Sequence, residues 1–240
     1  MGQRILVWDL PVRLFHWSLA ATFTAAYLTA EEEQWHAVHL TCGYLFAALI
    51  AFRLVWGIIG SRHARFASFV RGPVAAISYL RSLFSGTPQH FAGHNPAGAI
   101  AIVLLLLLGA GIVASGWMTL NEIGGEAFEE VHEVVANAML LLVFFHIAAV
   151  FISSHLHHEN LTAAMFTGRK NGKEDEKISH SRGYIAVIMV VALGLFGVAL
   201  TQGKVPALWD PNNPAHSAES GNEAGAEGNE QGGDHDKDDD

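Results

Sequence analysis

Long apolar segments alternate with polar connections along the chain. Five such segments cover roughly residues 14–29, 37–59, 97–120, 131–153 and 184–201, and each is bounded by charged residues or by Gly, Pro and Asn. A helix rises about 1.5 Å per residue, so about 20 apolar residues cross a bilayer. The apolar run at residues 100–108 continues into more apolar and small residues without a polar stripe, which favours a membrane span over the core of a soluble protein. We therefore predict an all-α fold, a transmembrane bundle of five helices.

The charged residues of the connections are sorted by sign. The N-terminal end and the connections at residues 60–96 and 154–183 carry Lys and Arg, whereas residues 30–36 and 121–130 carry Glu and neither Lys nor Arg. Because positively charged connections tend to stay in the cytoplasm, we expect a multi-pass protein of the bacterial inner membrane. Its N-terminus would be cytoplasmic and its C-terminus periplasmic. The alternation fits five spans and fits four or six poorly.

Composition agrees with a membrane protein and separates a polar tail from the rest. Hydrophobic residues make up 51% of the 240 residues and charged residues 15%, with a mean hydropathy of +0.28. We expect one transmembrane domain at residues 1–203, followed by an acidic tail at residues 204–240 that is too poor in apolar residues to fold. The single cysteine, Cys42, excludes a disulfide within the chain, covalent haem attachment through Cys-x-x-Cys-His and a four-thiolate iron–sulfur cluster.

Four histidines fall inside the predicted spans: His16, His39, His132 and His146. An ionisable side chain inside a membrane is costly and normally faces the interior of the bundle with a partner. His132 and His146 are 14 residues apart, which places them on one face of a helix and about 21 Å apart along its axis. In the expected topology His16 matches the depth of His146, and His39 matches the depth of His132.

Two histidine pairs at two depths indicate two bis-histidine sites stacked through the membrane. Neutral imidazole ligates haem iron, and helical bundles hold cofactors between facing helices. We predict that His16 with His146, and His39 with His132, each bind one haem b, in a four-helix dihaem core to which a fifth transmembrane helix is added. Zinc is the main alternative metal, but it usually takes three or four ligands at one depth.

Some of these assignments leave alternatives open. His36 competes with His39, which we prefer because it is deeper and because Gly43, one turn on, leaves room for a porphyrin. Three glycines of the third span fit either close approach of a haem or tight helix packing: Gly109, Gly111 and Gly116. The histidines of the connections are expected to be surface residues, and for the group His155, His157 and His158 the alternative is a metal site.

Arg53 is the only Lys, Arg, Asp or Glu of the second span. It lies 14 residues after His39, near the cytoplasmic side and on a similar face. It is therefore a candidate to neutralise a haem propionate or to contact a quinone. The alternative is that its side chain snorkels to the lipid headgroups.

Several short motifs recur together in one family. They are residues 7–13 with Phe15-His16-Trp17, His39 with Gly43-Tyr44, residues 53–57, residues 94–98, His132-Glu133, His146, and residues 158–161 before Met165 and Gly168. With these motifs the chain resembles the prokaryotic cytochrome b561 family, in the branch of the b-type cytochrome subunits of nickel–iron hydrogenases. The resemblance covers roughly residues 4–202. It implies that the four histidines bind two haems and that electrons pass between a quinone pool and a redox partner.

We expect a dihaem membrane cytochrome that transfers electrons across the bilayer between quinone and a periplasmic redox partner. That partner would be a c-type cytochrome, or a subunit of a hydrogenase or another dehydrogenase, and the chain would be the electron-transfer subunit of the oxidoreductase system. The acidic outer connections and tail favour a basic partner. Two alternatives are a stand-alone superoxide:quinone oxidoreductase and a haem-binding sensor or transporter without net redox function. The expected partners also include membrane lipid, but not nucleic acid.

Overall fold

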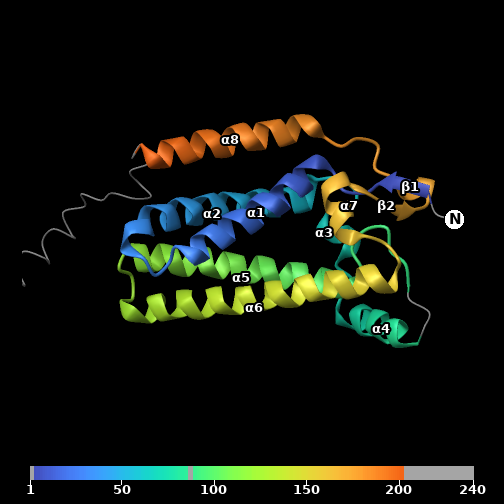
Figure 1. Cartoon of the computed structure of the whole chain (residues 1–240), viewed down its shortest axis with the longest axis horizontal. Helices are drawn as coiled ribbons and strands as arrows, with labels where there is room; N and C mark the ends of the chain where they lie inside the picture. The colour runs from blue at the N-terminus through green and yellow to red at the C-terminus, as the bar shows by residue number, and fades with distance from the viewer. Residues whose placement is uncertain (1–2, 86–88, 203–240) are drawn as a thin grey trace, which may run out of the picture. The chain divides into compact units, whose positions relative to one another are not determined.

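The computed structural model describes residues 3–85 and 89–202 of the chain, and most of them are helical (Figure 1). In chain order the elements are β1 (Gln3–Leu6), α1 (Leu10–Leu28), the 3₁₀ helix η1 (Glu33–Trp35), α2 (His36–Ile59), α3 (Phe66–Phe69), α4 (Pro73–Phe84), α5 (Pro96–Leu120), α6 (Glu126–Leu156), α7 (Leu161–Thr167), β2 (Arg169–Gly172), the 3₁₀ helix η2 (Glu174–Glu176) and α8 (Gly183–Thr201). The predicted acidic tail at residues 204–240 lies outside the described residues, so the domain boundary and the disorder of the tail stay predictions.

Four stretches of the described residues are helical, long and apolar enough to cross a membrane: Glu33–Ile59, Pro96–Leu120, Glu126–Leu156 and Gly183–Thr201. They match the second to fifth predicted spans. The first predicted span corresponds to α1, which has 19 residues but is less apolar because Arg13, His16 and Trp17 lie in its first half. α1 packs along α2 (Figure 1). The fold is therefore the predicted helical membrane bundle.

The helices α1, α2, α5 and α6 run side by side (Figure 1). α5 packs on α6 and α2, and α1 packs on α2. Phe23, Phe46, Ile50 and Met139 are buried together where α1, α2 and α6 meet. The outer faces of α5, α6 and α8 instead expose large apolar side chains, among them Leu107, Phe144, Phe151 and Val187. Such a continuous apolar surface is suited to lipid rather than to water.

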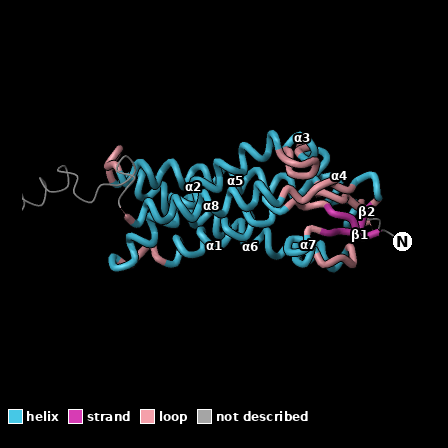
Figure 2. The backbone as a smooth tube through the Cα atoms, turned by 90° about the horizontal axis from the view of Figure 1, so that it is seen from above, coloured by secondary structure: helices cyan, strands magenta, loops and turns pink. Residues whose placement is uncertain are grey.

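Short elements cover one end of these helices (Figure 2). β1 pairs antiparallel with β2, which places Ile5 opposite Lys170, and α3, α4 and α7 lie at the same end. Beneath them is an apolar cluster that includes Val7, Trp8 and Trp56. We call this the capped end, and we call the opposite end, with η1 and the α5–α6 turn, the open end. The Arg- and Lys-rich connections lie at the capped end and the Glu-rich ones at the open end.

Candidate haem sites

The four predicted histidines lie on three helices of the bundle: His16 on α1, His39 on α2, and His132 and His146 on α6. The position of His16 depends on where α1 begins. Asp9 caps that helix, since its Oδ1 accepts a hydrogen bond of 2.8 Å from the Val12 N–H. The other carboxylate oxygen accepts one of 3.1 Å from Trp56 Nε1 on α2. The fully buried Asp9 therefore fixes both the start of α1 and its attachment to α2.

The structure brings the histidines together in the two predicted pairs. The ring centroids of His16 and His146 are 6.4 Å apart, and those of His39 and His132 are 6.1 Å apart. A metal ion between two imidazoles would place the ring centres about 6 Å apart, because each metal–nitrogen bond is about 2 Å long and each nitrogen lies about 1 Å from its ring centre. Both pairs therefore have the spacing that two imidazoles sharing one metal ion would need.

At the open-end pair, hydrogen bonds fix the tautomer of each ring. His39 Nδ1 lies 2.8 Å from the Ala26 carbonyl oxygen on α1, and His132 Nδ1 lies 3.1 Å from the Ile112 carbonyl oxygen on α5. A carbonyl oxygen can only accept, so each Nδ1 carries the proton and donates it. Each Nε2 is then left with a free lone pair. Iron-ligating histidines are typically held in this way by a backbone carbonyl.

Glycines next to the open-end pair have two different roles. A Cβ on Gly116 would lie 2.8 Å from Cε1 of His132, so the absence of a side chain lets that ring lie against α5. Gly43 has nothing within 4 Å of the position of a Cβ, so the space one turn after His39 is open. Gly109 and Gly111 instead face Ile50 of α2 and Val135 of α6. Those two glycines serve helix packing, which was the alternative interpretation.

His36, the alternative haem ligand to His39, is the first residue of α2 and is exposed. It is His39, one turn deeper, whose ring faces His132.

In the group at the end of α6, His157 stacks on Tyr79, while the rings of His155 and His158 lie 6.4 Å apart. Within residues 3–85 and 89–202 there is no cluster of three or more His, Cys, Asp or Glu that could hold a metal ion.

Several buried nitrogen atoms of the capped end have no hydrogen-bond partner among the described residues. They are Arg13 Nε, His16 Nδ1, Trp17 Nε1, Arg53 Nη1 and His94 Nδ1. The Trp17 ring packs edge-on against His16 at 5.0 Å, and His94 interacts electrostatically with both Arg53 and His146. An unpaired buried donor costs about 1–3 kcal/mol, so a group of them at one place indicates a missing acceptor.

Arg53 does not snorkel to the headgroup region. It is only 4% exposed, and its guanidinium carbon lies 4.7 Å above the ring of Phe66. Gly57 makes room for that ring, because a Cβ there would lie 2.0 Å from Phe66 Cε2. Asp9 is the nearby carboxylate and attracts the Arg53 charge, but it forms no ion pair with Arg53, and its oxygens accept hydrogen bonds from Val12 and Trp56. The buried charge of Arg53 therefore lacks a paired anion among the described residues.

His94, which we expected at the surface, contributes to the same place. Its ring packs against Trp8 at 4.5 Å and Phe69 at 4.6 Å. Burial lowers the pKa of His94 well below its ordinary value, and the positive charges of Arg53 and Lys170 lower it further. The imidazole is therefore neutral at physiological pH. In the sequence, the burial of His94 could have been inferred from its neighbour Asn95. Asn95 caps α5 by accepting a hydrogen bond of 2.7 Å from the Gly98 N–H, which holds His94 at the start of that helix.

Comparison with known families agrees with this arrangement. The family model described as prokaryotic cytochrome b561 matches residues 7–168, which is most of the chain. The chain belongs to the prokaryotic cytochrome b561 family. The matched region contains α1, α2, α5 and α6 and all four paired histidines, whereas β2 and α8 follow it.

Three curated relatives of this cytochrome carry the same description, probable Ni/Fe-hydrogenase B-type cytochrome subunit. The one from Azotobacter vinelandii is 25% identical over 133 residues, 44% of this chain and 55% of the relative. The one from Rhodobacter capsulatus is 20% identical over 219 residues, 71% of this chain and 83% of the relative. A third, from Azotobacter chroococcum, is 24% identical and is again covered over 55% of its length, so the chain spans only about half of the Azotobacter relatives. No solved structure is significantly similar to the chain.

The protein is therefore a membrane b-type cytochrome, and its residues suit haem b. With no Cys-x-x-Cys-His motif in the sequence, haem is held noncovalently. Haem b carries two propionate carboxylates, and the unpaired guanidinium nitrogens of Arg13 and Arg53 at the capped end are donors that a carboxylate would satisfy. The open Nε2 lone pairs of His39 and His132 suit the iron.

Proposed function

We propose that this cytochrome binds two haems b and passes electrons across the membrane between a quinone pool and a redox partner. One haem would be held by His16 and His146 at the capped end, and the other by His39 and His132 at the open end. The observation that carries this proposal is the pair of ring spacings, 6.4 Å and 6.1 Å, at two levels of one helix. Bound haem iron supplies reversible one-electron transfer at each level.

The residues between the two levels keep water out. Met139 lies midway between His132 and His146 on α6, Phe46 lies one heptad after His39, and both are buried. Phe46 also packs against Phe23 of α1, with ring centroids 6.1 Å apart. An electron moving between the two levels would therefore cross a dry layer of aromatic and thioether side chains.

The charge distribution supports an orientation. The capped end carries the Arg- and Lys-rich connections and would face the cytoplasm, so the His39–His132 pair would lie near the periplasm. The buried Arg53 supports a quinone site beside the capped-end pair, since a cation there would stabilise a reduced quinone or a propionate. The hydrogenase-subunit description of the relatives supports a hydrogenase as the redox partner at the open end. A c-type cytochrome or another dehydrogenase subunit would occupy the same position.

Single histidine variants test the pairing. We expect His16→Ala and His146→Ala to remove the same spectral component in a redox titration, and His39→Ala and His132→Ala to remove the other. His36→Ala is the matched control next to His39, and it should leave both components intact. If His16→Ala and His132→Ala removed the same component, the proposed pairing would be wrong.

A further inference from the structure

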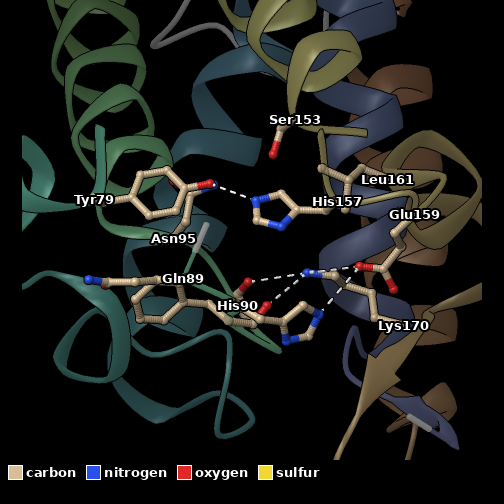
Figure 3. Close-up of a pocket in the computed structure, with 11 residues that line it drawn as sticks. Tyr79, Gln89, His90, Asn95, Ser153, His157, Glu159, Leu161 and Lys170 are labelled. Atoms are coloured by element: carbon tan, nitrogen blue, oxygen red, sulfur yellow. Dashed lines mark hydrogen bonds and ion pairs between the residues drawn. The ribbon is translucent and has the colours of Figure 1, made fainter. Parts of the chain in front are cut away.

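A small polar cavity lies at the capped end, outside the histidine pairs (Figure 3). Its volume is about 30 Å³, enough for one or two water molecules. Side chains that carry or exchange protons line it from four different segments of the chain: Tyr79 of α4, His90 of the α4–α5 connection, His157 and Glu159 after α6, and Lys170 of β2. A cavity lined by so many polar groups is suited to hold ordered water rather than to stay empty.

Lys170 and Glu159 form a nearly buried charged pair in this cavity. Lys170 Nζ lies 3.8 Å from Glu159 Oε2, and the two side chains are only 8% and 9% exposed. The ammonium group also donates to the carbonyl oxygens of Phe91 at 3.1 Å and Gly93 at 3.5 Å (Figure 3). Glu159 Oε1 accepts a hydrogen bond of 2.5 Å from the Asn171 N–H. Since burying such a pair adds little or nothing to stability, its presence calls for a role.

The cavity connects to water on one side through His90. The side chain of His90 is 47% exposed, and its Nε2 lies 4.0 Å from Glu159 Oε2. The rings of His90 and His157 are 6.2 Å apart, and His157 Nε2 lies 3.1 Å from the Tyr79 hydroxyl. A single water in the cavity would join groups at these separations into a continuous hydrogen-bonded chain.

On the other side the cavity approaches His94, which interacts electrostatically with His146 of the capped-end pair. Gly93, whose carbonyl accepts from Lys170, is followed directly by His94. His94 interacts electrostatically with Lys170 and also with Arg53 and His146. The charged pair therefore interacts with exposed His90 on one side and with His94 on the other.

We propose that His90, Glu159 and Lys170 form a proton-transfer path between the aqueous phase and a quinone site beside the capped-end pair. The inference rests on the proposed function. Reduction of a quinone to a quinol takes two electrons, which the redox partner supplies, and two protons, which this path brings from water to the two quinone oxygens. In quinol oxidation the same two protons leave by it.

Other titratable groups face the charged pair and set its protonation. They are Tyr79 of α4, His157 after α6, His63 between α2 and α3, and Glu176 of η2. Burial lowers the pKa of Lys170, while Glu159 and Glu176 act in the opposite direction. Burial lowers the pKa of His157, and His90 and Lys170 lower it further, while Glu159 acts in the opposite direction. Lys170 consequently releases a proton more readily than an exposed lysine does.

The test is Glu159→Gln in the full-length, haem-loaded protein, with Glu174→Gln as the matched control because Glu174 pairs with Lys177 at the exposed surface. Haem content is measured by pyridine haemochrome, and haem reduction by a short-chain quinol is followed by stopped flow across a pH series. We expect Glu159→Gln to retain its haem and to react about tenfold more slowly, because a proton carrier is lost. Added imidazole should restore part of the rate, and Glu174→Gln should match the wild type.

A second variant separates proton transfer from folding. His90→Gln changes a half-exposed residue, so it should fold normally and also show a slower, imidazole-restored rate. Wild-type rates in both variants would overturn the path, as would slow rates that imidazole does not restore. If quinol failed to reduce even the wild-type haem, the quinone function itself would be overturned and the path with it.

Discussion

At the scale of single residues, the most informative feature is the buried charge of Arg53, which forms no ion pair among the described residues. An arginine buried inside a membrane span is costly and usually has a partner. Here the ring of Phe66 covers one face of the guanidinium group, but Nη1 has no acceptor. A cation–π contact of this kind contributes about 0.5–2 kcal/mol, which does not replace an anion. The residue is therefore prepared for a negatively charged group that comes from outside the chain.

Replacing Arg53 tests that role. Arg53→Leu should slow electron transfer from quinol to haem by about tenfold or more, the equivalent of one charge-assisted hydrogen bond, while haem content changes much less. Arg53→Lys keeps the charge but not the planar guanidinium group, so its electron-transfer rate should lie between those of the wild type and Arg53→Leu. Stopped-flow reduction and a pyridine haemochrome assay on the same preparations measure both quantities. Unchanged transfer rates in Arg53→Leu would remove Arg53 from the quinone site.

The residues that could be predicted from sequence are those whose positions follow from helix geometry. His132 and His146 had to share a face because 14 residues make nearly four whole turns, and His16 and His39 followed from the depth of their spans. His94 and Lys170 could not be predicted in this way. They lie in connections, where burial depends on which distant segments cover them, such as Trp8 and Phe69 over His94.

At the scale of elements, hydropathy predicted the long helices well, because a membrane span must be apolar along its whole length. The pairing of β1 with β2 could not be recognised from the hydropathy of the sequence. Each strand has four residues, and β1 is paired with a segment more than 160 residues later in the chain. That pairing matters for the site, because it places Lys170 and holds the start of α1 at the capped end.

The contact between α5 and α6 provides a sharp test of the open-end site. Gly116→Ala puts a Cβ 2.8 Å from Cε1 of His132, so the ring must move away from α5 and from the Ile112 carbonyl. We expect the open-end haem to be bound more weakly or to change its potential, while the capped-end haem is unaffected. Redox titration of the purified variant resolves the two components.

The matched control for that variant is Gly194→Ala on α8, where nothing lies within 4 Å of the added methyl group. It changes the same residue type in a membrane helix, and alanine is the better helix former by about 1 kcal/mol. Both haem components should therefore be retained in Gly194→Ala. An equal loss in the two variants would mean that the effect of Gly116→Ala comes from the helix and not from His132.

At the scale of the whole molecule, the two ends of the bundle differ in charge. The open end carries exposed Glu31, Glu32, Glu33, Glu126 and Glu129, and the sequence continues after α8 into an acidic segment at residues 204–240. We expect a basic redox partner to associate with this end faster at low ionic strength, because salt screens attraction between exposed charges. Stopped-flow transfer to a basic cytochrome c, with and without residues 215–240, measures the effect. A rate insensitive to salt in both proteins would contradict electrostatic docking.

The proposed function depends first on two stacked histidine pairs that each bind one haem b. The most direct measurement is haem stoichiometry in the detergent-purified full-length protein, by pyridine haemochrome against amino-acid analysis, together with its reduced and oxidised spectra. Two noncovalent haems b per chain with low-spin bis-histidine spectra are predicted, falling to one when either His146→Ala or His132→Ala is made. One haem or none per wild-type chain would contradict the binding of a haem by each histidine pair.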